Sequence, residues 1–305
     1  MTCDVEAART GRPWVGRART ALTRARTSTA VRTSTAVRTS TVRRGQVARV
    51  AGVVAAGILA TTALAGCDGG LFGTAKASGP LDCGQYQEKT PEAGAPLLLV
   101  LLDVSDNGPA AAQRVEDRLQ PYLDAALKDG SFIRVVASGG GPMTYSDCFH
   151  GDKMFQVKRN NSRREEKDRT AAAKALGTEV NHIVQAEKVT PTGSVTGLLG
   201  GAGDEINSVR STPGVKVTDV TVLAWTDLLG TGENSDCLNT SGRTASPSIA
   251  EALVKRCFET NQISSVAPAK VRFLGVNEGT ADRPQQELAR YLRAELCRRI
   301  SSDCS

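Results

Sequence analysis

Continuous apolar runs alternate along the chain with segments whose apolar residues recur at helical spacing. An apolar run without polar interruption is typical of a strand that is buried on both faces of a sheet. The clearest is LLLVLL at 97–102. The same reasoning predicts strands at 132–137, 220–225 and 271–276. We expect one further strand, at an edge of the sheet, over 143–155.

The segments between these runs have apolar residues at the spacing of a helix. Proline in the first turn and glycine after the last turn are typical helix boundaries. The predicted helices are one that opens at Pro109 and stops at Gly130, a charged one over 163–188, an amphipathic one over 195–209, a short one over 249–258, and a closing one with Pro284 in its first turn. Strands that alternate with helices need crossover connections, so we expect an α/β fold with a doubly wound, mostly parallel sheet flanked by helices.

Residues 1–49 show no such pattern and form a basic, low-complexity leader. RTSTAV occurs twice from Arg26, and RTSTV follows from Arg38. The chain has a net charge of +6, but eleven of its 38 basic side chains and only two of its 32 acidic ones lie in residues 1–50, which leaves −3 for the rest. Two interpretations stay open: translated upstream sequence with the true start near Val42, or a disordered basic tail.

The charge balance of the rest of the chain argues against a nucleic-acid partner. Proteins that bind nucleic acid neutralise phosphates with an excess of lysine and arginine. Beyond the leader, acidic side chains outnumber basic ones.

Residues 50–66 are uncharged, follow several arginines and end in small residues, as the hydrophobic region of a secretory signal does. The closing LAGC at 64–67 resembles the lipobox of bacterial lipoproteins, which implies cleavage before Cys67 and attachment of acyl chains to it. We therefore expect a lipid-anchored protein on the extracytoplasmic face of the cell membrane. An ordinary signal peptide or a weak membrane anchor is the alternative. Residues 67–94 then form the lipidated cysteine and a flexible tether, and 95–305 the folded domain.

Six cysteines follow Cys67, and an even number beyond an export signal suggests disulfides. A structural zinc site is a poor interpretation, because no CxxC pair exists and the chain has two histidines. Proximity in the sequence favours the pairs Cys237 with Cys257, Cys297 with Cys304, and Cys83 with Cys148.

Oxygen-bearing side chains follow the first buried strand at alternate positions, namely Asp103, Ser105 and Asn107. A loop of this kind can direct three oxygens at one point, and hard cations such as Mg²⁺ prefer oxygen ligands. The alternative is helix capping, because Asp, Ser and Asn are common just before helices such as the one that opens at Pro109.

The segment DVSDN resembles the metal-ion-dependent adhesion site of the von Willebrand factor A family, with Asn107 in place of the second serine of that pattern. In that resemblance Asp103 and Ser105 come from the first loop, Thr192 of TPTGSVTGLL from the second, and Asp227 of WTD from the third. It implies a bound Mg²⁺ or Mn²⁺ and a protein partner that presents a carboxylate to the ion. A glycine often follows the third-loop aspartate in the family, whereas this chain has leucine there.

We find no catalytic constellation and expect no enzyme. The serine of GSVTG at 193–197 follows the first glycine directly, so the segment is not a nucleophile elbow. The glycines of GLLGGAG at 197–203 favour close helix packing over phosphate binding, and His182 falls inside a helical pattern. Two further classes stay open: a solute-binding lipoprotein of a transporter, and a metal-free structural or interaction module of the cell envelope.

Overall fold

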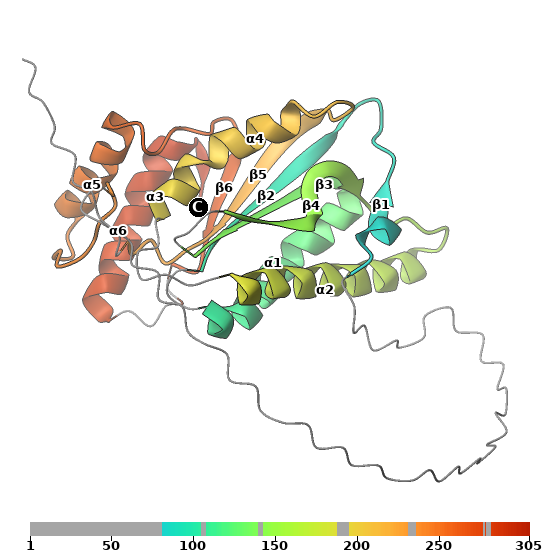
Figure 1. The fold of residues 1–305 in the computed structure, drawn as a ribbon, viewed down its shortest axis with the longest axis horizontal. Helices are drawn as coiled ribbons and strands as arrows, with labels where there is room; N and C mark the ends of the chain where they lie inside the picture. Colours follow the sequence, from blue (N-terminus) through green and yellow to red (C-terminus); the bar gives the residue numbers. More distant parts are fainter. Residues whose placement is uncertain are drawn as a thin grey trace, which may run out of the picture. The chain divides into compact units, whose positions relative to one another are not determined.

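The computed structural model describes residues 81–305 except 105–107, 140–142, 188–194, 231–235, 277 and 279–281. These residues form a seven-stranded sheet in the order β1-β4-β3-β2-β5-β6-β7 (Figure 1). The strands are β1 (Gln87–Glu88), β2 (Ala95–Asp103), β3 (Ser131–Ser138), β4 (Thr144–Phe155), β5 (Val217–Trp225), β6 (Lys270–Leu274) and β7 (Asp303–Cys304). The helices are α1 (Gly108–Asp129), α2 (Ser162–Ala186), α3 (Val195–Gly200), α4 (Ala202–Arg210), α5 (Pro247–Glu259) and α6 (Arg283–Ile300), and a short 3-10 helix, η1, spans Cys83–Tyr86.

The sheet is mostly parallel, which confirms the predicted α/β class. β2 is parallel to both of its neighbours, β3 and β5, and β5, β6 and β7 continue in the same direction. Only β4 and β1 add antiparallel pairings, at one side of the sheet. The five predicted strands correspond to β2 to β6, whereas the two-residue strands β1 and β7 are too short to leave a pattern in the sequence.

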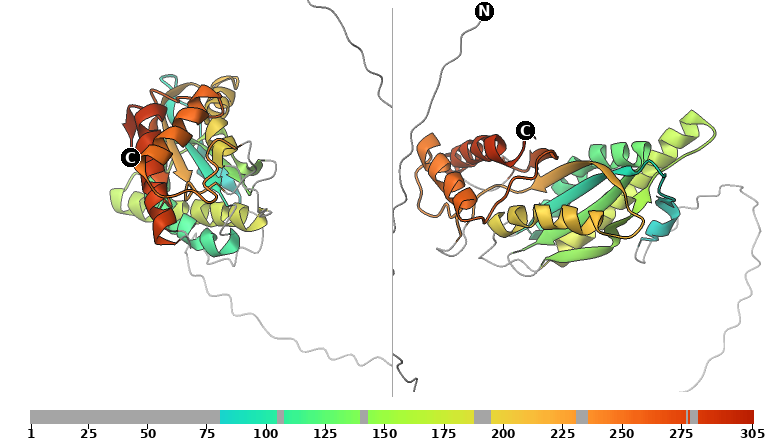
Figure 2. Two further views of the ribbon diagram at one scale, coloured as in Figure 1. Left: turned by 90° about the vertical axis from the view of Figure 1, so that its left-hand side faces the viewer. Right: turned by 90° about the horizontal axis from the view of Figure 1, so that it is seen from above.

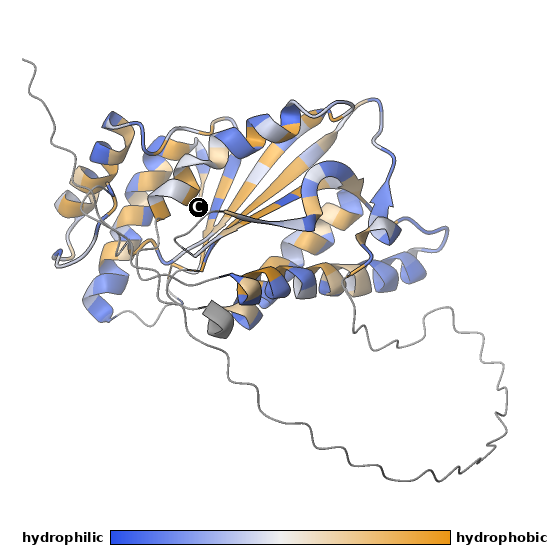
Figure 3. Ribbon diagram, viewed as in Figure 1, coloured by the Kyte–Doolittle hydropathy of each residue, from blue (hydrophilic) through white to orange (hydrophobic). Residues whose placement is uncertain are grey.

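Helices cover both faces of the sheet (Figure 2). Leu97, Leu99 and Leu101 of β2 pack in one cluster with side chains from α3 to α6. The alternate residues of the same strand pack in the other cluster with α1 and α2. Because both faces of β2 are buried, its apolar run is unbroken, and apolar residues concentrate along the strands in Figure 3.

The single amphipathic helix predicted over 195–209 is two helices. α3 ends at Gly200 and α4 begins at Ala202, with Gly201 between them. A Cβ at Gly200 would overlap the backbone carbonyl oxygen of Gln262, so this glycine lets the helix approach the chain after α5. The expected packing role of the GLLGGAG glycines is confirmed at this position.

The folded part begins earlier than residue 95. We call residues 81–88 the strap. They contain η1 and β1, and β1 pairs with β4 through Gln87 opposite Phe155 and Glu88 opposite Met154. The last part of the predicted tether, which contains η1 and β1, therefore belongs to the folded domain. β1 also lies outside β4, so β4 is the edge strand for only part of its length.

All three disulfides that proximity favours are formed. Their Cα atoms lie 5.6, 5.0 and 5.1 Å apart for Cys83–Cys148, Cys237–Cys257 and Cys297–Cys304, respectively. They join the strap to β4, the chain after β5 to α5, and α6 to β7.

Among the described residues, no helix combines the length and the apolarity that crossing a membrane requires.

Candidate functional site

The candidate site lies where the chain changes its direction of travel across the sheet. From β2 the chain crosses to β3 on one side, and after α4 it returns to β5 on the other side. Such a switch point opens a crevice at the carboxyl ends of the two strands, where ligands of α/β proteins gather. Leu102 of β2 lies opposite Trp225 of β5, so the residues that follow both strands emerge at the same edge.

Asp103 is the last residue of β2 and is half-buried. Its Oδ2 accepts a hydrogen bond from Thr226 Oγ1 at 2.9 Å, across the boundary between the two strands. Thr226 is 1% exposed, and its Oγ1 in turn accepts a hydrogen bond from the Leu228 backbone N–H at 3.0 Å. The threonine therefore fixes the orientation of the Asp103 carboxylate and ties it to the loop that follows β5.

Asp227 follows Thr226 and is also half-buried. Its Oδ1 accepts a hydrogen bond from the Leu229 backbone N–H at 2.9 Å, which closes a local turn. Leu228, inside that turn, has a φ of +63°, in the left-handed region that favours glycine. Its side chain is completely buried. This explains the departure noted in the sequence, because the backbone here has the conformation of a glycine while the side chain fills the core.

The loop after β5 is fastened at its far end as well. Asp236 is buried and accepts hydrogen bonds from Thr196 Oγ1 and from the Leu238 backbone N–H. Thr196 belongs to α3, and the disulfide partner Cys237 lies next to Asp236. The buried carboxylate thus holds this loop against the start of α3, and the disulfide joins it to α5.

Three of the five predicted ligands, Ser105, Asn107 and Thr192, lie outside the described residues. Of the five, the structure places Asp103 and Asp227, and it brings them to one edge through Thr226. Sequence reasoning missed Thr226 and Asp236. The sequence signals for these two residues were weak. Thr226 is a hydroxyl residue between the end of an apolar run and Asp227, and Asp236 is an acidic residue next to a cysteine.

The oxygen atoms at this edge are of the kind that hard cations prefer as ligands. Asp103 and Asp227 offer carboxylate oxygens, and the predicted partners from the other loops would add neutral hydroxyl or amide oxygens. Within the described residues, no group of three or more histidine, cysteine, aspartate or glutamate side chains could hold a metal ion. A site of two carboxylates completed by neutral hydroxyl or amide oxygens would not need such a group, because it contains only two acidic side chains.

The two histidines lie elsewhere, with exposed side chains. His150 of β4 is 3.9 Å from an Asp147 carboxylate oxygen, and His182 of α2 is 3.7 Å from a Glu179 carboxylate oxygen. The sequence left His182 as either packed or exposed, and it is exposed. The two residues of each acid–histidine pair are three positions apart in the sequence, and both pairs are ordinary surface contacts.

Comparison of the chain with family models, with curated proteins and with solved structures finds no match. The case for a function therefore depends on the geometry of the switch point and on the motifs of the chain.

Proposed function

We propose that this protein is a lipid-anchored binding protein on the extracytoplasmic face of the cell membrane, which holds a partner protein at the carboxyl edge of its sheet. The observation that carries the proposal is the placement of Asp103 and Asp227 at the same edge of the β2/β5 switch point, with Thr226, which follows β5, hydrogen-bonded to Asp103. An isolated helix cap requires no such link between two strands that lie 123 residues apart in sequence.

The resemblance to the von Willebrand factor A family extends the proposal to a divalent cation. It requires the strands that precede the first-loop and third-loop aspartates to be neighbours, and β2 and β5 are neighbours. Asp103, Ser105, Asn107, Thr192 and Asp227 would hold Mg²⁺ or Mn²⁺ there. When bound, the cation would supply an electrophilic position for a carboxylate of the partner.

The residues of this chain prepare the edge for such a ligand. The bond from Thr226 orients Asp103, and the turn closed by Leu229 N–H orients Asp227. Both carboxylates are only half-buried, so they remain accessible to solvent and to an incoming group. Hydrogen-bonded, preoriented oxygens lose little freedom on binding.

The anchoring part of the proposal depends on the signal-like segment 50–66 and on Cys67, which lie outside the described residues. The disulfides support export, because three such bonds in one domain are typical of an oxidising compartment.

Calorimetry with Mg²⁺ and Mn²⁺ tests the site. We expect binding heat with the purified protein and its loss in Asp227→Ala. Asp219→Ala is the matched control, because Asp219 is an exposed carboxylate near the opposite end of the same strand. Heat that survives Asp227→Ala would contradict the site, and absence of heat in the unchanged protein would favour the metal-free module.

Crosslinking and pull-down from membranes of the native cell, with and without a chelator, tests the partner. We expect a protein that is captured in the presence of the divalent cation and lost with the chelator. Retention of a labelled sugar, peptide or amino acid by the purified domain would instead favour the solute-binding alternative. Membrane fractionation of Cys67→Ser, which we expect to release the protein, tests the anchor.

A further inference from the structure

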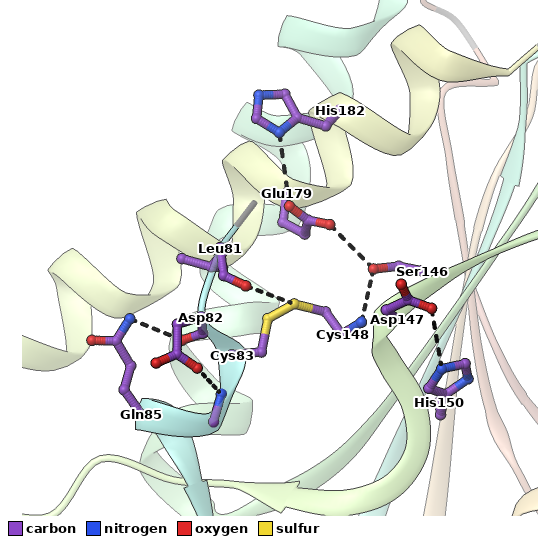
Figure 4. Close-up of a disulfide and its surroundings, with 11 residues drawn as sticks. Leu81, Asp82, Cys83, Gln85, Ser146, Asp147, Cys148, His150, Glu179 and His182 are labelled. Atoms are coloured by element: carbon purple, nitrogen blue, oxygen red, sulfur yellow. Dashed lines mark hydrogen bonds and ion pairs between the residues drawn. A yellow bond between two sulfur atoms is a disulfide. The ribbon is translucent and has the colours of Figure 1, made fainter. Parts of the chain in front are cut away.

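A groove of about 480 Å³ runs beside the Cys83–Cys148 disulfide, between the strap, β4 and the last turns of α2. Both cysteines line it, and Figure 4 shows the disulfide with Glu179 and His182 of α2 on one side and Ser146 and Asp147 of β4 on the other. A volume of several hundred Å³ is enough to admit a small molecule or a side chain.

The three disulfides differ in how far a reagent can reach them. Cys237 and Cys257 are both 0% exposed and belong to the central core. Cys148, in contrast, is partly exposed in the groove, whereas its partner Cys83 is 6% exposed. The third disulfide joins residues only seven apart, and both of its cysteines are partly exposed. The end of the chain has further bonds to β6, because Phe273 N–H donates to Ser305 O and Ser305 N–H donates to Val271 O.

The Cys83–Cys148 disulfide joins two segments that share few backbone hydrogen bonds, although Leu81 and Tyr86 of the strap also pack against the cluster that contains α1 and α2. On one side, the strap pairs with β4 through the two residues of β1, and Tyr86 O accepts one further bond from Gln156 N–H at 3.0 Å. On the other side, the described ladder between β3 and β4 passes from Arg134 opposite His150 to Val136 opposite Tyr145, so residues 146–149 bulge out of it. Two-residue pairing contributes little by itself, because short strand pairs are marginal in water.

We propose that Cys83–Cys148 is a thiol–disulfide exchange site, and that its reduction releases the strap from β4 while the rest of the domain stays folded. A thiolate enters the groove and attacks Sγ of Cys148, the more exposed of the two residues, so that a mixed disulfide forms and Cys83 leaves as a thiolate that takes up a proton. The second thiol of the reductant then attacks the reductant sulfur of the mixed disulfide, and Cys148 leaves as a thiolate that takes up a proton. The dithiol reductant is oxidised to a disulfide, and two cysteine thiols are produced.

The groove also selects the reductant by charge. Asp82, Asp147 and Glu179 line it, and the described lining contains one histidine, His182, but no lysine or arginine. Of the three acids, Glu179 is the most enclosed, with a side chain 17% exposed that accepts a hydrogen bond from Ser146 Oγ at 3.2 Å. Anionic thiols are repelled by such a lining and cationic ones are attracted. The substrate class is therefore a neutral or cationic thiol, or a dithiol protein with a positive surface around its reactive cysteine.

Reduction of the folded protein, followed by alkylation and peptide mass mapping, tests the proposal. We expect Cys83 and Cys148 to be labelled while Cys237 and Cys257 stay joined, and labelling of Cys297 and Cys304 has no bearing on the strap. Limited proteolysis within 81–94 should rise at least about tenfold after reduction, with the far-ultraviolet circular dichroism unchanged. Resistance of Cys83–Cys148 until the whole domain unfolds, or reduction without any new cleavage of the strap, would overturn the proposal.

Paired small thiols test the selection by charge. After correction for thiolate fraction, cysteamine should react about fivefold faster than mercaptoethanesulfonate at low salt, and the ratio should shrink in high salt. The double substitution Asp147→Asn, Glu179→Gln should reduce the ratio toward one, and Asp219→Asn should leave it unchanged. If the ratio is the same in all three proteins, the groove does not select by charge.

A variant that lacks the disulfide gives an independent measurement. In the double substitution Cys83→Ser, Cys148→Ser, the strap should be cleaved without reductant at the rate seen in the reduced protein. A strap that stays protected in this folded variant would contradict the release. If the variant does not fold, the disulfide is needed for the whole domain, and that outcome also contradicts the proposal.

Discussion

The central strand β2 and the outer strand β4 show two ways of holding a strand in this sheet. β2 pairs in parallel with a neighbour on each side, and its residues from Leu97 to Leu102 are buried on both faces. β4 is antiparallel to β3, bulges out of register and is joined to its outer neighbour by two residue pairs and a disulfide. Packing on both faces thus supports the end of β2, where the candidate ligands lie, whereas the strap outside β4 is held by two residue pairs and by the disulfide that we propose a thiol can reduce.

The largest effect is expected from a cavity in the central strand. Leu99→Ala in β2 removes a side chain that is 0% exposed and should lower the free energy of unfolding by about 3 kcal/mol. Chemical denaturation measures it. Lys153→Ala, at an exposed position of β4, should change the stability by less than about 0.5 kcal/mol and serves as the control. A similar loss in both variants would remove the contrast between the strands.

The stability lost when a disulfide is removed should not follow the length of the loop that the disulfide closes. Chain entropy alone predicts a greater loss for Cys83–Cys148, which spans 65 residues, than for Cys237–Cys257, which spans 20. We expect the reverse, with about 3 kcal/mol lost when Cys237 and Cys257 are replaced by alanine and less than about 2 kcal/mol for Cys83 and Cys148. The reason is that a released strap regains freedom in the folded state too, which offsets the entropy gained by the unfolded chain. Thermal denaturation of both variants decides the order.

The bridge at the switch point should affect binding more than folding. Thr226→Val removes the hydroxyl that donates to Asp103 and should destabilise the fold by about 1 kcal/mol. It should also weaken Mg²⁺ or Mn²⁺ binding in calorimetry, because the Asp103 carboxylate loses its fixed orientation. Thr226→Ser keeps the hydroxyl and should preserve both properties. Unchanged cation affinity in the valine variant would mean that this bond does not prepare the site.

The smallest effect is expected at Tyr145 of β4, which donates a hydrogen bond to Glu205 Oε1 at 2.9 Å. Partial burial raises the pKa of this phenol above its usual value of 10.0, and the hydrogen bond to Glu205 adds to the rise. The stability that depends on the neutral phenol is therefore fully present below pH 10 and is lost as the pH rises through the raised pKa.

Tyr145→Phe should lose at most about 1 kcal/mol at pH 7. Above pH 10 the stability of this variant should also fall less steeply than that of the unchanged protein, because the variant has no phenol at 145 to ionise. Denaturation curves at pH 7 and at alkaline pH measure both effects. An equal alkaline decline in the two proteins would show that Tyr145 contributes nothing to it.

Hydrophobic patterning along the chain determined the elements and the class of fold. The runs from β2 to β6 are readable because burial on one or both faces demands apolar side chains at fixed spacing, and helix boundaries at Gly130 and Pro284 follow from backbone geometry. The disulfide partners could be predicted because four of the six cysteines form two pairs that are close in the sequence, which leaves Cys83 and Cys148 for each other. The aspartates at the ends of β2 and β5 were found in the same way, since each directly follows a buried run or comes two residues after it.

Only the tertiary structure decided the contacts that join distant segments. The close approach of Gly200 to the Gln262 backbone is such a contact, and the early start of the fold depends on pairing of β1 with β4. The bridge from Thr226 to Asp103 likewise forms because β2 and β5 are neighbours. Patterning is a local property that burial imposes on each element, whereas these contacts depend on which elements meet, and that is settled only when the whole sheet is assembled.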